Sequence, residues 1–221
     1  MRLLGAGQML ARVAPALLLL RPTPRWRSCS PLGCAREEED ARFMQLALAQ
    51  ASLAFQAGEI PIGAVLVRGG ECIAAERNRV EELQDASAHA EMLCLRSGSA
   101  ALHSWRLLGT TLYVTVEPCP MCLAASHAFR IDRLVYGTVN PRLGAVESSM
   151  AQHSHPNDEH PFHSFEISGG VLADEASEIM QRFFKRRRSG DAAVDKPPEG
   201  QLRREGDALR GGSRPTVERS R

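Results

Sequence analysis

The chain has 221 residues, of which 43% are hydrophobic and 24% are charged, and its formal net charge is +1. This length suits one domain of about 150 residues with extensions, and the composition is close to that of an average globular protein. The longest apolar run, Val13 to Leu20, is shorter than the ~20 residues that a membrane-spanning helix needs. We therefore expect no membrane span, and the absence of internal repeats excludes solenoids and propellers.

The small net charge hides a strong asymmetry along the chain. Residues 1–36 carry +6 with no acidic residue, residues 37–181 carry −11, and residues 182–221 carry +6. Because the middle is acidic, attraction to phosphate would have to come mostly from the basic run between Arg182 and Arg188. An arginine-rich, acid-free start is typical of an organelle transit peptide. A secretory signal and a plain extension of a cytoplasmic protein stay open as alternatives.

Composition divides the chain into three parts. We expect a targeting segment at residues 1–36, addressed to a plastid or mitochondrion, and a folded domain at residues 37–188. Residues 189–221 are rich in glycine, proline and charged residues and poor in apolar ones, which predicts a disordered basic tail.

Apolar periodicity and turn residues predict the elements of the folded domain in chain order. The first helix is expected to start near Glu37 and end at Gly58, and a hairpin turns at Gly69-Gly70. A second helix is expected to close at Gly98. The expected order is a helix at 37–58, strands at 60–67 and 71–75, a helix at 87–96, a strand at 111–116, a helix at 119–129, strands at 134–137 and 165–167, and a helix at 174–188. This order predicts an α/β domain with a central mixed five-stranded sheet and helices on both faces.

Three residues of types that commonly bind metal ions lie at the starts of two predicted helices. His89 heads one predicted helix, and Cys119 and Cys122 head the next, so their side chains could converge on one point. Helix N-termini favour negative charge and therefore the thiolate forms. One imidazole and two thiolates suit Zn²⁺ and leave a fourth position open, which is typical of a catalytic site. Zinc would lower the pKa of a water in that position toward neutrality.

Glu91 lies two residues after His89 and is not needed as a ligand. A carboxylate in this place could take a proton from the water and return it to a leaving group. A structural zinc site and a redox Cys-x-x-Cys pair are the alternatives. Both motifs together, each at a helix start, favour catalytic zinc.

The remaining cysteines and histidines have simpler interpretations. Cys72 and Cys94 lie in apolar surroundings and are expected to be buried thiols. His127 is expected to be a packed or surface residue. The four histidines within residues 153–163 lack regular spacing, which favours a polar loop over a second metal site.

His89-Ala90-Glu91 and Pro118-Cys119-Pro120-Met121-Cys122 resemble the H-x-E and P-C-x-x-C signature of the zinc nucleobase deaminases. The flanking sequence is similar to the tRNA adenosine deaminases, which convert the wobble adenosine of an anticodon to inosine. The similarity runs from about residue 40 to residue 188. The segments that carry it are 60–67, 78–79, 88–92, 111–122, 134–137, 170–175 and 183–188.

The resemblance implies a cytidine-deaminase-like three-layer α/β/α fold with one Zn²⁺ per subunit, held by the three ligands named above. It implies that Glu91 is the catalytic proton shuttle and that Asn78 binds the flipped base; the alternative is that Asn78 is a turn residue after the hairpin. It further implies a homodimer acting on a tRNA anticodon loop, with the basic end at residues 183–188 near RNA phosphates. Those basic residues could instead only complement the helix dipole.

Two positions depart from the family pattern. Asn140 stands where the family loop commonly has aspartate, and Glu147 stands near a small glycine of the family. Either difference could alter contact with the RNA backbone. Two other functions stay open: deamination of a free nucleobase or nucleotide of guanine or cytosine type, and a non-catalytic RNA-binding subunit. Subunits of the latter kind lack the shuttle glutamate, so the presence of Glu91 disfavours that alternative.

Overall fold

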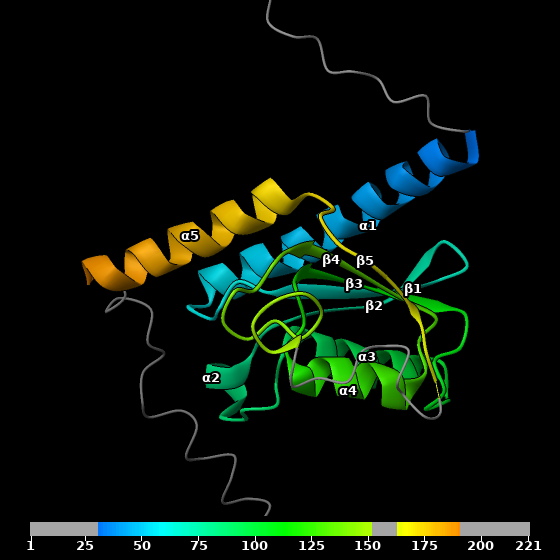
Figure 1. Ribbon diagram of the computed structural model, residues 1–221. Helices are drawn as coiled ribbons and strands as arrows, with labels where there is room; N and C mark the ends of the chain where they lie inside the picture. Colours follow the sequence, from blue (N-terminus) through cyan, green and yellow to red (C-terminus); the bar gives the residue numbers. More distant parts are fainter. Residues whose placement is uncertain (1–30, 152–162, 191–221) are drawn as a thin grey trace, which may run out of the picture.

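A mixed five-stranded sheet forms the centre of the protein in a computed structural model that describes residues 31–151 and 163–190 (Figure 1). The strands are β1 (Gly63–Arg68), β2 (Glu71–Arg77), β3 (Thr110–Val116), β4 (Arg133–Thr138) and β5 (Glu166–Ser168), in the order β2-β1-β3-β4-β5. β1 is antiparallel to β2 and β3, whereas β3, β4 and β5 are parallel to one another. The predicted mixed five-stranded sheet is confirmed.

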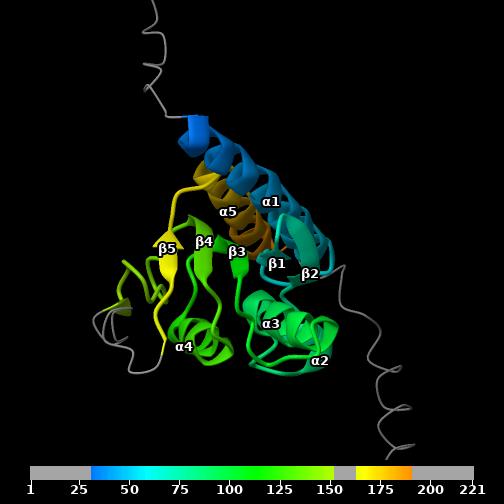
Figure 2. The same ribbon diagram turned by 90° about the vertical axis from the view of Figure 1, so that its right-hand side faces the viewer.

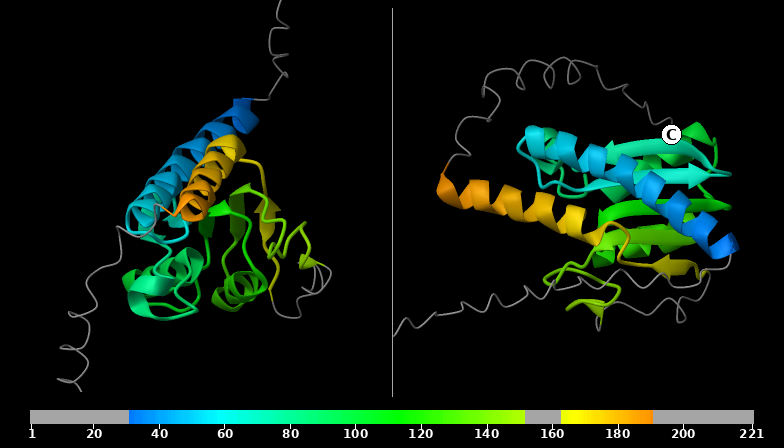
Figure 3. Two further views of the ribbon diagram at one scale, coloured as in Figure 1. Left: turned by 90° about the vertical axis from the view of Figure 1, so that its left-hand side faces the viewer. Right: turned by 90° about the horizontal axis from the view of Figure 1, so that it is seen from above.

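Helices cover both faces of this sheet (Figure 2). The helices are α1 (Pro31–Gln56), α2 (Val80–Leu83), α3 (Ala90–Ala101), α4 (Pro120–Phe129) and α5 (Ala173–Ser189). α1 and α5 lie side by side across one face, and α3 and α4 lie on the other (Figure 3). The central strands are covered on both faces, which explains why they are apolar along almost their whole length. The predicted three-layer α/β/α arrangement is therefore correct.

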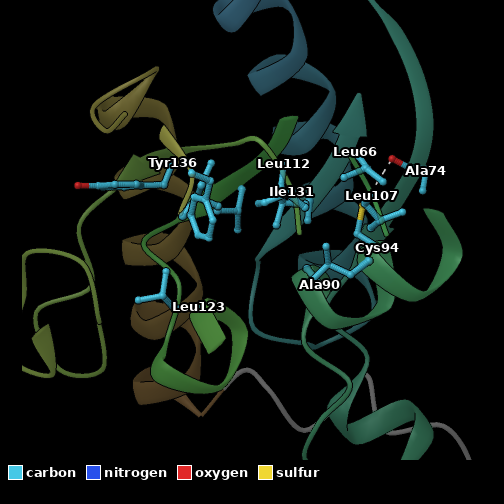
Figure 4. Close-up of a cluster of buried hydrophobic side chains, with 14 of the residues drawn as sticks. Leu66, Ala74, Ala90, Cys94, Leu107, Leu112, Leu123, Ile131 and Tyr136 are labelled. Carbon is cyan, nitrogen blue, oxygen red and sulfur yellow. Dashed lines mark hydrogen bonds between the residues drawn. The ribbon is translucent and has the colours of Figure 1, made fainter. Parts of the chain in front are cut away.

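Side chains alternate between two hydrophobic clusters along each strand. Val65 and Val67 of β1 face α1, together with Phe43 and Met44 of that helix. Leu66 faces the α3 and α4 side, where a larger cluster forms. Figure 4 shows this second cluster; its labelled members are Leu66, Ala74, Ala90, Cys94, Leu107, Leu112, Leu123, Ile131 and Tyr136. Both faces of the sheet thus hold a packed core that fixes the helices relative to the strands.

The predicted start of the first helix is wrong. α1 begins at Pro31, ahead of the expected Glu37. The turn before Glu37 is anchored to the sheet because Arg36 Nη2 donates to Glu166 Oε1 at 2.5 Å. This ion pair joins the first turns of α1 to β5, a contact between residues 130 positions apart that the local acidic residues do not reveal.

The prediction that Gly98 ends the second helix is also wrong. α3 continues through this residue to Ala101. Gly98 is fully buried, and a Cβ at this position would overlap the side chain of Leu66. The glycine therefore allows α3 to approach the sheet closely and does not stop the helix.

Two described cysteines lie outside the Cys-x-x-Cys motif, and only one of them has the burial that was predicted. Cys94 is fully buried, as predicted, and its Sγ lies 3.6 Å from the carbonyl oxygen of Ala74. Cys72 is exposed, so its predicted burial is wrong. β2 is an edge strand whose pairing register shifts beside Val67, and Cys72 lies at that irregular position.

Several predictions fall on residues outside the described ranges. They concern most of the proposed targeting segment (residues 1–30), most of the predicted tail (residues 191–221) and the histidine-rich segment up to residue 162. Within residues 31–151 and 163–190, no helix has both the length and the apolar character needed to cross a membrane.

Candidate metal centre

The fold brings together the three predicted metal ligands. β3 and β4 are parallel, so the C-terminal ends of both strands lie at the same end of the sheet. β3 leads directly into α4. Cys119 is the residue immediately before α4, and Pro120 occupies the first helical position, where its missing N–H is not needed. His89 stands in the same position before α3. The two helices lie side by side (Figure 2), so their N-termini come together at this end of the sheet.

The ligand atoms of His89, Cys119 and Cys122 all lie within 4.8 Å of one another. His89 Nδ1 is 3.7 Å from Cys119 Sγ and 3.5 Å from Cys122 Sγ. Within the described ranges, no further histidine, cysteine or carboxylate joins this group. The arrangement supplies three protein ligands and leaves room for a non-protein ligand on a metal.

The charges within this group fit a divalent cation. A hydrogen bond from the Cys122 thiol, together with one from His89, lowers the pKa of Cys119 to about 4. The same contact with Cys119, reinforced by burial, raises the pKa of Cys122. These shifts favour the thiolate at Cys119 and the thiol at Cys122. Because a metal ligand must be deprotonated, Zn²⁺ would displace the thiol proton and complete a donor set of two thiolates and one imidazole.

Glu91 lies in the first turn of α3, against the metal ligands. It is only 3% exposed, and its Oε2 forms no hydrogen bond within the part of the chain that the structure describes. Burial raises the pKa of Glu91 to about 7. A buried carboxyl without a partner is costly, and such groups gather at catalytic sites. A pKa near neutrality suits a group that both accepts and returns a proton.

Asn78 is buried at the end of β2, near the metal ligands. Its neighbour Arg79 donates a backbone hydrogen bond to the carbonyl of Ala88 at 3.0 Å, and Ala88 directly precedes His89. Asn78 Nδ2 donates to Glu59 Oε2 at 3.1 Å. The amide nitrogen thus points at Glu59, and the side chain is held in one orientation.

Sequence reasoning did not single out Glu59. This residue is 2% exposed, and its second oxygen accepts a hydrogen bond from the backbone N–H of Glu82 at 2.8 Å. A signal was available: Glu59 follows the C-terminus of α1, where the helix dipole disfavours an acidic residue. An acidic residue at this unfavourable place indicates that its carboxylate contacts another part of the chain.

The two positions that depart from the family pattern both have partners. Asn140 Oδ1 accepts a hydrogen bond from the backbone of Leu143 at 3.2 Å, so an amide still caps this turn without the charge of an aspartate. Glu147 Oε1 accepts a hydrogen bond from the hydroxyl of Tyr136 at 2.6 Å. His127 is 4% exposed and packs beside the ring of Phe165, as a packed residue was expected to do.

The basic C-terminal end of α5 points toward the same end of the sheet as the N-termini of α3 and α4, although α5 covers the opposite face (Figure 1). Phe183 of α5 contacts Phe55 near the end of α1, with the ring centroids 6.0 Å apart. From there the chain enters β1 at Gly63, whose N–H donates to Thr115 Oγ1 near the end of β3. Arg186 stacks over the Phe55 ring at 5.7 Å, so aromatic side chains help to order the basic end.

Comparison with known proteins supports this reading of the site. A family profile described as the cytidine and deoxycytidylate deaminase zinc-binding region matches residues 37–138. The tRNA-specific adenosine deaminase of Agrobacterium fabrum is 44% identical over 153 residues, which cover 69% of this chain and 99% of that protein. A chloroplastic tRNA(adenine(34)) deaminase of Arabidopsis thaliana is 45% identical over 175 residues, which cover 73% of this chain but only 13% of that protein.

Solved structures agree with these sequence matches. A structure from a study of A-to-I editing by tRNA:A34 deaminases has 46% identity and a TM-score of 0.58, covering 62% of this chain and 98% of that one. A guanine deaminase from Nitrosomonas europaea, with 21% identity and a TM-score of 0.51, covers 70% of this chain and 85% of that one and shares the fold alone. With the zinc-binding motif, the ligand cluster and near-complete coverage of a relative at 44% identity, the chain belongs to the family of tRNA-specific adenosine deaminases.

Proposed function

We propose that this protein is a zinc-dependent hydrolase that converts adenosine to inosine at the wobble position of tRNA. The observation that carries the proposal is the buried carboxyl of Glu91, with one oxygen that forms no hydrogen bond within the described residues, beside the cluster of one histidine and two cysteines. This pairing fits hydrolytic removal of an amino group. The adenosine and tRNA part of the proposal is supported by the names of the relatives that match nearly end to end.

The reaction replaces the amino group on C6 of adenine with oxygen and releases ammonia. Zn²⁺, when bound by His89, Cys119 and Cys122, supplies a Lewis acid that makes water a nucleophile near neutral pH. Glu91 accepts one proton of the attacking water as the C–O bond forms and passes it to N1 of adenine. It then takes the remaining hydroxyl proton and delivers it to the amino nitrogen as the C–N bond breaks, so ammonia leaves and the carboxyl ends in its starting state. Its pKa of about 7 suits both steps.

We propose that Asn78 binds the extruded base. Its side chain is buried, ordered by Glu59 and one residue from a backbone contact with Ala88. Because Nδ2 is engaged with Glu59, the carbonyl oxygen is the group best placed to accept a hydrogen bond from the base. A fixed amide of this kind distinguishes between bases by their pattern of donors and acceptors.

The proposed partner is an anticodon loop, whose unpaired bases can be extruded at low cost. The basic last turn of α5 supports this choice, since that helix end points toward the same end of the sheet as the N-termini of α3 and α4, and its arginines would attract the phosphates that flank the target base. The acidic character of the rest of the domain limits this attraction to a local region.

The direct test incubates the zinc-loaded full chain with an anticodon stem-loop that carries adenosine at the wobble position. Free adenosine, cytidine and guanine are assayed in parallel, and Glu91→Gln serves as a matched inactive control. We expect inosine in the stem-loop alone. Deamination of a free base or nucleoside alone would favour the small-molecule alternative and remove tRNA as the substrate. Absence of every product, together with RNA binding, would favour a non-catalytic subunit.

Two further parts of the proposal concern assembly and location. A homodimer is proposed by family resemblance, and sedimentation as a monomer at micromolar concentration would contradict it. An organelle location is proposed for the full chain because residues 1–36 contain six arginines and no acid, and because one relative is named as chloroplastic. A fluorescent fusion of the full chain that stays in the cytoplasm would contradict this location.

A further inference from the structure

One buried carboxylate next to the metal ligands has no part in the mechanism above. Glu117 is 2% exposed and lies two residues before Cys119. Within the described residues, no lysine, arginine or histidine forms an ion pair with it. Transfer of an unpaired carboxylate from water into a protein costs several kcal/mol unless hydrogen bonds replace the lost hydration. The buried charge of Glu117 must therefore be stabilised by several hydrogen bonds.

These hydrogen bonds come entirely from the segment 140–148, which follows β4. Glu117 Oε1 accepts hydrogen bonds from the backbone N–H groups of Val146 at 2.9 Å, Glu147 at 2.8 Å and Ser148 at 3.1 Å. Oε2 accepts one from the backbone of Asn140 at 2.9 Å and another from the hydroxyl of Ser148. One side chain thus binds both ends of the segment.

The segment lies directly beside the metal ligands. Glu117 N–H donates to the carbonyl of Thr138 at 2.8 Å, which joins the ends of β3 and β4. Ala145 N–H donates to the carbonyl of Pro118 at 3.0 Å, and Pro118 is bonded to Cys119. Gly144 packs so closely on the carboxylate of Glu117 that a Cβ would overlap it. The glycine, the carboxylate and the ligand-bearing turn therefore form one unit.

The segment also has contacts that do not involve Glu117. Glu147 accepts a hydrogen bond from Tyr136, and Ala145 and Val146 pack in the hydrophobic cluster on the α3 and α4 side. Residues 141–143 are exposed, and Leu143 is 55% exposed. Loss of the Glu117 carboxylate would leave up to four backbone N–H groups without their acceptor at once, so the conformation of the segment depends strongly on this side chain.

We propose that Glu117 is a positioning residue of the deamination reaction: it holds residues 140–148 as a fixed wall of the substrate site beside the metal ligands. Glu117 does not touch the reacting atoms. It acts through the segment, whose residues 141–143 are exposed and would contact RNA beside the target base. This inference rests on the proposed function, because the wall has a role only if a substrate larger than a free base is bound.

The Glu117→Gln substitution tests the proposal, because the glutamine side chain has nearly the same shape as that of glutamate. The amide NH₂ that replaces one oxygen cannot accept hydrogen bonds, so it faces at least one backbone N–H of the segment with a second donor. If the binding-competent conformation falls to about a tenth of the population, KM for the stem-loop rises about tenfold. We expect kcat to change less than about threefold on the same argument, and zinc content to stay at one ion per chain.

The matched control is Asp40→Asn. Asp40 is also a buried carboxylate held by hydrogen bonds, but its partners Arg133 and Tyr113 lie toward the opposite end of β3 and β4. This variant is expected to lose stability without a change in KM. Ser148→Ala is a second, milder variant, because it removes only the hydroxyl contact with Glu117. We expect KM to rise about fivefold, since a single hydrogen bond contributes about 1 kcal/mol.

Three results would overturn the inference: unchanged KM in Glu117→Gln, a loss of kcat alone, or a loss of zinc from that variant. If Glu117→Gln fails to fold, an unchanged KM in Ser148→Ala overturns it. Failure of the proposed function is separable, because the unmodified protein would then not deaminate the stem-loop at all.

Discussion

Glu59→Gln tests whether the orientation of Asn78 matters for activity. Glu59 accepts one hydrogen bond from Asn78 Nδ2 at 3.1 Å and one from the backbone of Glu82 at 2.8 Å. A glutamine amide can accept only one of these, and its NH₂ opposes the other donor. A hydrogen bond to a charged group contributes about 1.5–3 kcal/mol. We therefore expect stability to fall by about 2 kcal/mol, or roughly 4–8 °C in melting temperature for a domain of this size.

The same loss is expected to reach the substrate through Asn78. If a misoriented amide forfeits about 1.4–2.8 kcal/mol of binding to the base, kcat/KM for the stem-loop falls about 10–100-fold. Zinc content should not change, since Glu59 contacts none of the three ligands. Glu82→Gln is the matched control, because the carboxyl of Glu82 is partly exposed and pairs only with Arg77 and Arg79.

A double-mutant cycle separates this explanation from a general loss of stability. In the Asn78→Ala background, Glu59→Gln should lower kcat/KM less than about threefold, because residues that act as a unit are not additive. Equal effects of Glu59→Gln in the presence and absence of the Asn78 side chain would refute the reasoning. They would mean that Glu59 supports the fold and does not position Asn78.

Three other outcomes follow from the site and the core. Glu91→Gln should retain zinc and lower kcat by about 10²–10⁴-fold, as for loss of a general acid–base group; activity within tenfold of the unmodified protein would exclude the shuttle role. Cys119→Ala should lose zinc and melt at a lower temperature, measured by elemental analysis and calorimetry. Asp40→Asn should destabilise the domain by about 3 kcal/mol, because Arg133 is left buried without its main partner. Burial alone would raise the pKa of Asp40, but hydrogen bonds from Arg133 and Tyr113 outweigh it and hold the pKa below its ordinary value of 3.8. The ionised carboxyl therefore stabilises the fold above its ordinary pKa, and this contribution disappears as pH falls through the lowered pKa. In urea titrations Asp40→Asn should lack that part of the acid sensitivity, and an unchanged pH profile would contradict the assignment.

The group of candidate metal ligands could be predicted because its chemistry is contained in short motifs. His89 and Cys119 each occupy the cap of a helix, and a helix start is a local feature of sequence. The order of strands and helices was equally accessible, because the central strands are continuously apolar. Convergence of the two helix starts then follows from β3 leading into α4 and from the close packing of α3 and α4.

The supporting carboxylates were not predictable in the same way. Glu59 acts on a residue 19 positions away, and Glu117 on residues about 30 positions away, so neither contact has a local signature. Gly98 was misjudged for a related reason. Its role is to admit Leu66 of β1, and sequence alone does not distinguish a glycine needed for packing from one that ends a helix.

The edges of the sheet determine how copies of this chain can meet. At one edge β5 has only three residues. At the other edge the pairing of β2 shifts register beside Val67, and Glu71 lies exposed at the start of the strand. Short strands, bulges and edge charges all oppose the addition of a further strand. Growth into a continuous intermolecular sheet is therefore disfavoured at both described edges, which leaves the helices and loops as the surfaces through which folded copies would meet.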